Sequence, residues 1–138
     1  MKSINTLVAI LFISLLSSPS WSIRLVDLVE REGLYYEKFT DVPFTGEVTG
    51  KEQGSFRNGE REGAWVWYYE DGQLWFKENY KNNKKEGRRV IYYKSGQLRL
   101  EGNYKNGKSE GAWVFYNEDG TINKELTGTY KDGVKISD

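Results

Sequence analysis

The chain has no cysteine and no histidine, and each absence removes a class of function. Without cysteine there is no disulfide scaffold, and without either residue the usual ligands of zinc, haem and iron–sulfur clusters are missing. Nucleophilic catalysis by a Ser–His or Cys–His arrangement is excluded for the same reason. We therefore expect no cofactor and no metal site.

The chain also has no excess of charge of either sign, because 20 Lys and Arg residues balance 20 Asp and Glu residues. Proteins that bind nucleic acid usually carry a basic surplus that meets the phosphates, so we expect no nucleic-acid partner. The length of 138 residues suits one domain. Aromatic residues make up 15% of the sequence, and this composition favours strands over long helices.

The first residues have the pattern of a signal peptide. Lys2 precedes an apolar run from Leu7 to Leu16, and small residues then offer a cleavage site after Ser22. The run is about half of the ~20 apolar residues that span a bilayer. We interpret residues 1–22 as a cleaved signal peptide, with an uncleaved anchor or a buried strand as the alternative. The mature chain is then expected to be periplasmic or secreted and to have no transmembrane segment.

The main signal is an internal repeat. Three segments align without gaps and follow one another at a constant interval: GAWVWYYEDGQL from Gly63, GRRVIYYKSGQL from Gly87 and GAWVFYNEDGTI from Gly111. An earlier, degenerate unit ends at Phe56, just before Arg-Asn-Gly. The chain therefore divides into the signal peptide, a degenerate repeat or cap over residues 23–62, and three repeats with a C-terminal hairpin end over residues 63–138.

Each repeat contains two kinds of turn. Glycine stands third in Glu-Asp-Gly or Lys-Ser-Gly, which suits a three-residue hairpin loop ending in a left-handed residue. Asn-Gly or Asp-Gly pairs further on favour two-residue turns, and Asn83 can take the same positive φ as the glycine it replaces. Short strands between these turns predict an all-β meander of hairpins.

Positions that match in every repeat are predicted to form the structural core. A three-residue loop would place Tyr68 opposite Leu74, and Tyr80 follows Leu74 at an even offset, so these side chains are expected on one face. The predicted core comprises Val66, Tyr68, Leu74, Tyr80, Val90, Tyr92, Leu98, Tyr104, Val114, Tyr116, Ile122 and Tyr130.

The opposite face would then carry a second group of aromatic residues. These are Trp65, Trp67, Tyr69, Trp75, Trp113 and Phe115. A single-layer sheet has no second sheet to cover them, and exposed aromatic patches tend to mark interaction sites. The sequence leaves two interpretations open: a partner-binding surface, or packing within a twisted sheet or beneath the N-terminal segment.

The repeated pattern Gly-x-Trp-x-x-Tyr-Tyr-x-x-Gly-x-Leu, followed by Tyr-x-x-Gly, resembles the bacterial variant of the MORN repeat. The resemblance covers about Gly54 to Gly133, with departures at Arg88-Arg89 and at Asn83. It implies an elongated, single-layer antiparallel sheet of stacked hairpins without catalytic residues. Members of this variant are often labelled antitoxins, and eukaryotic relatives are scaffolds.

Catalysis by paired carboxylates remains formally open, because acidic residues are plentiful. Most of them, however, lie in the turns or just before the first glycine of each repeat: Glu62, Glu70, Asp71, Glu86, Glu110, Glu118 and Asp119. We therefore expect a non-enzymatic module that binds a protein, in the manner of a scaffold, antitoxin or immunity protein. The alternative is a module that binds carbohydrate or cell wall through the tryptophan face, and an enzyme comes third.

Overall fold

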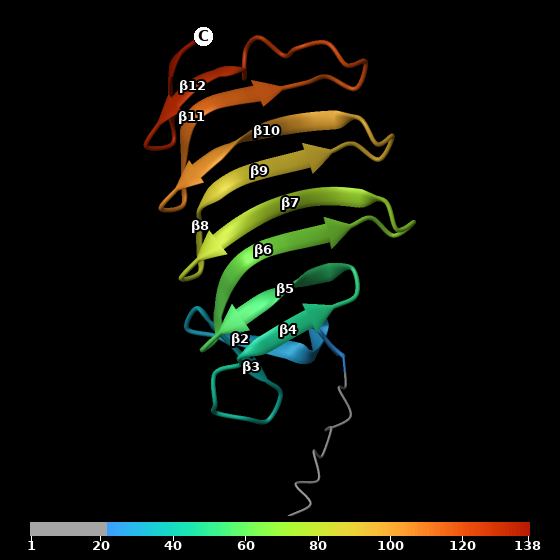
Figure 1. Ribbon diagram of the computed structural model, residues 1–138, viewed down its shortest axis with the longest axis vertical. Coiled ribbons are helices and arrows are strands. Elements are labelled where there is room, and N and C mark those ends of the chain that lie inside the picture. Colours follow the sequence, from blue (N-terminus) through green and yellow to red (C-terminus); the bar gives the residue numbers. More distant parts are fainter. Residues whose placement is uncertain (1–21) are drawn as a thin grey trace, which may run out of the picture.

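The computed structural model describes residues 22–138, and these residues form one antiparallel sheet with a small hairpin beside it (Figure 1). The sheet follows the order β1-β4-β5-β6-β7-β9-β10-β11-β12-β13, with β8 paired to β7. Among the described strands, only β1 (Ile23–Arg24) and β4 (Gly46–Thr49) run parallel. The described residues contain no α-helix. The prediction of an all-β array of stacked hairpins is confirmed. The predicted signal peptide lies outside the described residues, except for Ser22.

The elements are short, as the spacing of the turns predicts. The N-terminal part contains β1 (Ile23–Arg24), a short 3₁₀ helix (Leu25–Asp27), β2 (Leu28–Arg31), β3 (Leu34–Glu37), β4 (Gly46–Thr49) and β5 (Glu52–Arg57). The repeats contain β6 (Glu60–Tyr68), β7 (Leu74–Lys81), β8 (Lys84–Lys85), β9 (Gly87–Tyr92), β10 (Leu98–Lys105), β11 (Lys108–Phe115), β12 (Gly128–Lys131) and β13 (Val134–Ser137).

Both kinds of turn form as expected. The Tyr69 amide donates to the Gln73 carbonyl at 2.8 Å across a three-residue loop, and Gly72 closes that loop with a φ of +85°. Two-residue turns close the other ends of the strands, and Asn83 has the positive φ predicted for it, 61°. In Figure 1 the three-residue loops lie at one end of the strands and the two-residue turns at the other end.

The predicted face is wrong for three tyrosines of the core set, because a bulge changes the parity of the strand. These are Tyr80, Tyr104 and Tyr130. Tyr68 pairs with Leu74 as expected, but Trp67 pairs with Phe76, so Trp75 is an extra residue. An extra residue reverses the face of every side chain beyond it. Tyr80 therefore packs against Trp65, with ring centroids 6.2 Å apart.

The other repeats show the same reversal. Arg99 is the extra residue between the pairs Tyr92–Leu98 and Ile91–Leu100. Tyr104 and Tyr130 consequently lie beside Trp113, with ring centroids at 5.0 Å and 6.2 Å. The insertion of two positions in the last repeat keeps Tyr130 equivalent to Tyr80 and Tyr104, because an even insertion does not change the parity.

The sheet therefore has an aromatic face and a valine face. On the aromatic face, one row crosses the strands from Trp67 through Phe76, Ile91 and Leu100 to Phe115. On the valine face, Val66, Val90 and Val114 alternate with Lys77 and Glu101. Of the residues predicted for the core, Ile122 is 51% exposed, which corrects that assignment.

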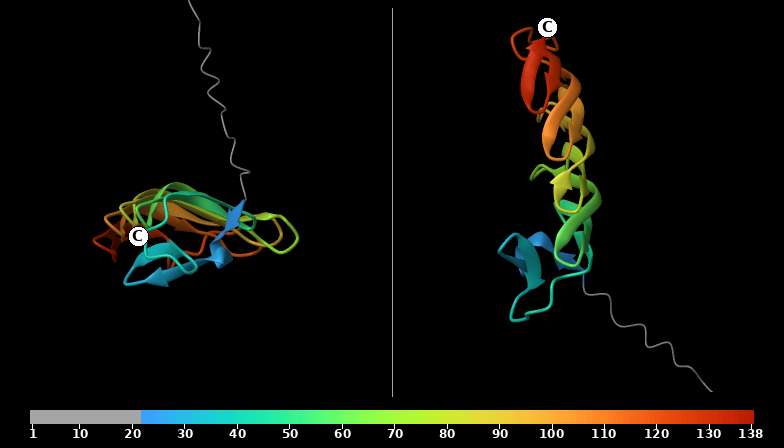
Figure 2. Two further views of the ribbon diagram at one scale, coloured as in Figure 1. Left: turned by 90° about the horizontal axis from the view of Figure 1, so that it is seen from below. Right: turned by 90° about the vertical axis from the view of Figure 1, so that its left-hand side faces the viewer.

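The main core lies on the aromatic face at the N-terminal end of the sheet. The β2–β3 hairpin stands beside that end (Figure 2), and the buried cluster there consists of Leu28, Phe44, Val48, Phe56 and Trp65. Backbone hydrogen bonds from Tyr35 to Gly59 and from Gly59 to Phe44 tie the hairpin and the following segment to the first two-residue turn. The part of the chain predicted as a degenerate repeat or cap thus covers Trp65.

Candidate functional site

Two of the six aromatic residues predicted to bind a partner are inaccessible. Trp65 has 0% exposure and Trp113 has 4%. Of the two interpretations that the sequence left open, packing is therefore correct for these residues. Burying a large aromatic side chain is among the strongest contributions that one residue makes to a core.

The same arrangement buries both tryptophans. Trp65 lies between Phe56 and Tyr80, with ring centroids at 4.9 and 6.2 Å. Trp113 lies between Tyr104 and Tyr130 in the equivalent position. A Cβ atom on Gly54 would approach the Trp65 ring to 2.2 Å, which no side chain tolerates.

Gly102 has the corresponding role beneath Trp113, where a Cβ atom would approach the indole ring to 2.1 Å. The Trp113 indole nitrogen also donates to the Asn103 carbonyl at 3.1 Å. Each buried tryptophan therefore requires a glycine on the preceding strand, and the interval from that glycine to its tryptophan is the same in both repeats.

The middle repeat replaces this pair by two charged residues. Glu78 stands midway in the sequence between Gly54 and Gly102, and Arg89 stands midway between Trp65 and Trp113. Glu78 is 3% exposed, and its Oε2 accepts a hydrogen bond from Arg89 Nη1 at 2.7 Å. Lys85 Nζ lies 3.3 Å from the same oxygen.

The second carboxylate oxygen of Glu78 accepts a hydrogen bond from the Tyr80 hydroxyl at 2.6 Å. Burial, and then this contact with a carboxylate, raises the pKa of Tyr80 well above its usual value. Arg89, Lys85 and Tyr80 all contact the Glu78 carboxylate, so we interpret the cluster as part of the core and not as a catalytic site.

The aromatic face becomes accessible toward the three-residue loops. Trp75, the extra residue of the bulge, is 40% exposed. Its ring stacks on Tyr69 with a centroid distance of 5.6 Å and meets Phe76 edge-on at 4.8 Å. Phe76 in turn stacks on Trp67 at 4.2 Å. We call these four residues the tryptophan shelf.

The shelf is held in place by the neighbouring repeat. The Tyr69 hydroxyl donates to the Tyr92 carbonyl at 2.8 Å, and the Tyr93 hydroxyl donates to the Tyr116 carbonyl at 2.7 Å. Beside Tyr93, at the position equivalent to Trp75, the Arg99 guanidinium lies 5.6 Å from the Tyr93 ring. Tyr69 and Trp75 were predicted to bind a partner. Tyr93 and Arg99, which occupy the equivalent positions one repeat later, were not included among the predicted binding residues.

The repeated glutamates have a structural role that the sequence did not reveal. The carboxylates of Glu62, Glu86 and Glu110 accept hydrogen bonds from the first amide of the next two-residue turn, at 3.1, 2.8 and 3.2 Å. Thr45 replaces the glutamate in the degenerate unit, where its hydroxyl accepts from the Asn58 amide at 2.8 Å. These carboxylates therefore link one repeat to the next.

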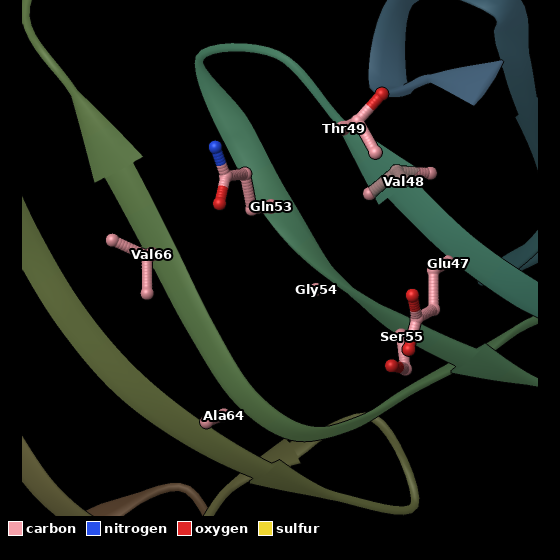
Figure 3. A pocket seen from close by; sticks show the side chains of 8 residues that line it. All are labelled: Glu47, Val48, Thr49, Gln53, Gly54, Ser55, Ala64 and Val66. Carbon is pink, nitrogen blue, oxygen red and sulfur yellow. The ribbon is translucent and has the colours of Figure 1, made fainter. Parts of the chain in front are cut away.

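A shallow hollow on the opposite face is a weaker candidate. It has a volume of about 310 Å³ and lies over Gly54, between β4, β5 and β6 (Figure 3). Glu47 is its single charged residue, and the remaining lining is small or uncharged. Within residues 22–138, no group of three or more acidic side chains is placed to hold a metal ion. No helix in the same range is both long and apolar enough to cross a bilayer.

Comparison with known proteins gives a match for two of the repeats. A family model described as MORN repeat variant matches residues 61–82 and 85–106. None of the curated proteins compared with the chain matches it. Among solved structures, a chain of "Crystal structure of GtfA/B complex bound to UDP and GlcNAc" aligns with a TM-score of 0.31 and 15% identity. That alignment covers 79% of this chain but 29% of the other.

Proposed function

Residues 61–82 and 85–106 match the MORN repeat variant, and we propose that the chain is an exported, non-enzymatic scaffold that binds a protein partner through the tryptophan shelf. The observation that supports this proposal is the exposure of Trp75, at 40%, next to tryptophans that are buried. Trp75 is not an isolated exposed residue, because its ring continues into Tyr69, Phe76 and Trp67, and contiguous aromatic surfaces tend to mark interaction sites.

The shelf has the features of a binding anchor. Tryptophan is enriched among the residues that dominate binding energy, because its large rigid surface loses little conformational entropy on binding. Trp75 is already fixed between Tyr69 and Phe76 before any partner arrives. Bulges are also common where a strand must redirect a side chain toward a functional surface.

The surroundings of the shelf suit a protein interface. Charged side chains lie in and around the loop next to it, where Lys51 and Glu70 form an ion pair and Lys94 Nζ lies 4.0 Å from Asp71 Oδ2. An apolar centre with a polar rim is the usual arrangement of protein–protein interfaces.

Export is part of the proposal. It is supported by the apolar run near the N-terminus and by the expected cleavage point, which precedes the first strand and would leave β1 (Ile23–Arg24) intact. The antitoxin label of related proteins suggests one form of the function, an immunity-type complex with a toxic partner outside the cytoplasm.

The proposal is tested by crosslinking the mature chain, residues 23–138, to proteins of the cell envelope. We expect Trp75→Ser to weaken capture of the specific partner about thirtyfold, the effect of losing an anchor worth about 2 kcal/mol. Phe39→Ser is the matched control, because Phe39 is fully exposed but lies far from the shelf in the chain. Equal capture by Trp75→Ser and the natural chain would contradict the proposal.

Carbohydrate binding is separated from protein binding by a titration. If soluble cell-wall fragments change the tryptophan fluorescence of the natural chain, and Trp75→Ser removes this change, the shelf binds glycan instead of protein.

A further inference from the structure

The two-residue turns form a row at one end of the strands, opposite the three-residue loops (Figure 1). The residues that flank each turn pair directly across the hairpin. In the middle of the row these pairs are Lys81 with Lys84 and Lys105 with Lys108. Like charges in directly opposed positions destabilise a hairpin, so the fold itself gives no reason for them.

The other turns of the row do not repeat this arrangement. Arg57 pairs with Glu60 at the first turn, and Lys131 pairs with Val134 at the last. The two like-charged pairs are therefore specific to the middle of the array and are not a requirement of the repeat.

The lysines of this row have no acidic partner in the described part of the chain. None of Lys81, Lys84, Lys105, Lys108 and Lys131 takes part in an ion pair there, and all five are exposed. The nearby carboxylates of Glu86 and Glu110 are occupied by turn amides instead.

Adjacent turns enclose a hollow between them. It has a volume of about 340 Å³, and its lining consists of Lys105, Asn106, Lys108, Glu110, Lys131 and Asp132. Three ammonium groups and two carboxylates thus line this space, and one of the carboxylates, that of Glu110, already accepts a hydrogen bond from the Asp132 amide.

The row has a definite length. Consecutive turns are two strands apart, or roughly 10 Å at about 4.8 Å per strand. From the turn after β7 to the turn after β12 is therefore about 20 Å, which about six residues span in extended conformation at ~3.3 Å each.

We propose that the lysine row binds an acidic segment of a protein, about six residues long and extended across the ends of the strands. The row consists of Lys81, Lys84, Lys105, Lys108 and Lys131. The row is one hairpin wide and ends at Lys131, since Glu60 lies in the turn before the row and Asp132 directly follows Lys131 in its last turn. A linear acidic segment fits between these limits, whereas a flat anionic bilayer would also meet the two carboxylates. The row and the shelf lie at opposite ends of the strands, so this inference does not depend on the function proposed for the shelf.

The test uses fluorescently labelled hexaglutamate and the mature chain. We expect Lys84→Glu/Lys108→Glu to weaken binding by about tenfold or more and to reduce its sensitivity to salt. Because the double variant converts two Lys–Lys pairs into Lys–Glu pairs, its unfolding midpoint should stay the same or rise. Loss of binding together with unchanged or increased stability cannot result from misfolding.

Lys38→Glu/Lys124→Glu is the matched control, with the same change of net charge at two exposed lysines outside the row. It should keep its affinity for hexaglutamate, and so should Trp75→Ser. If the double variant of the row fails to fold, Lys84→Gln/Lys108→Gln replaces it and should also lose affinity.

Three outcomes would overturn the inference. One is that the natural chain does not bind hexaglutamate in low salt. Another is that the control variant loses as much affinity as the row variant. The third is that vesicles of phosphatidylcholine with phosphatidylserine bind the natural chain as strongly as hexaglutamate does and lose that binding with the row variant, which would identify a membrane surface as the ligand.

Discussion

Glu78 and Arg89 form an ion pair, 2.7 Å from Oε2 to Nη1, at the place where the repeats on either side hold a glycine beneath a tryptophan. The glutamate at position 78, in place of glycine, and the arginine at position 89, in place of tryptophan, depend on each other. A tryptophan at position 89 would lie over position 78, as Trp113 lies over Gly102, and only glycine leaves room for it. Arginine fits beside a longer side chain and neutralises its charge.

This dependence predicts strong coupling between the two positions. Glu78→Gly alone leaves Arg89 largely buried without its carboxylate, and Arg89→Trp alone meets the Glu78 side chain, so each should lower the free energy of unfolding by about 3 kcal/mol. The double variant restores the pattern of the neighbouring repeats and should be close to the natural chain in stability. Urea denaturation of all four proteins gives the coupling energy. Additive losses would show that the positions act independently.

The repeats in the sequence predict the hairpins of the fold. The constant interval between repeats and the two kinds of turn predict the hairpins, their loop lengths and the pairing of Tyr68 with Leu74, all of which the structure shows. The dependence of Trp65 on Gly54, and of Trp113 on Gly102, is also visible in the sequence, because the interval from glycine to tryptophan is the same in both repeats. This interval is the signal that distinguishes the two buried tryptophans from the exposed one.

The sequence does not predict on which face of the sheet Tyr80, Tyr104 and Tyr130 lie, because one unpaired residue in the strand determines it. Counting from Leu74 places Tyr80 on the same face, and the bulge at Trp75 reverses that result. Leu74, Trp75 and Phe76 are all apolar, so the pattern of the sequence does not mark Trp75 as the extra residue. The burial of Trp65 also depends on the distant β2–β3 hairpin, which no local pattern predicts.

Gly102→Ala should disturb the packing of Trp113. The new methyl group would overlap the indole ring, and overpacking of this kind costs about 1–3 kcal/mol. Near-ultraviolet circular dichroism should change as the ring moves. Gly96→Ala is the control: it strains a positive φ, but the nearest atom to its Cβ is 4.0 Å away. An unchanged aromatic spectrum in Gly102→Ala would contradict the close contact.

Tyr80 should make the stability of the protein depend on pH at alkaline values. Its pKa is raised in the folded state above the ordinary value of 10.0, so folding favours the protonated phenol. The stability that the protonated Tyr80 phenol contributes is complete below the pKa of the unfolded chain. It is lost as the pH rises above that value toward the pKa of the folded state. Between about pH 10 and 12, Tyr80→Phe should therefore show a flatter decline in unfolding free energy than the natural chain. Equal slopes would mean that Tyr80 ionises normally.

Exported protein should begin at Ile23. We expect N-terminal sequencing of the mature chain to show cleavage after Ser22, because the apolar run ends shortly before small residues. Leu11→Arg should block this processing, since a charge in the centre of the run prevents its recognition. Exported material that starts at Met1 would contradict the prediction.

The two kinds of tryptophan should respond differently to truncation. Trp65→Ser empties a fully enclosed site and should cost roughly 3–5 kcal/mol of stability, and Trp113→Ser should behave in the same way. Trp75→Ser removes a partly exposed ring and should cost about 1 kcal/mol, the value of its contact with Tyr69 and Phe76. Thermal and urea unfolding measure these losses. If Trp75→Ser were as unstable as Trp65→Ser, the tryptophan shelf would belong to the core, and the proposed partner would lose its binding site.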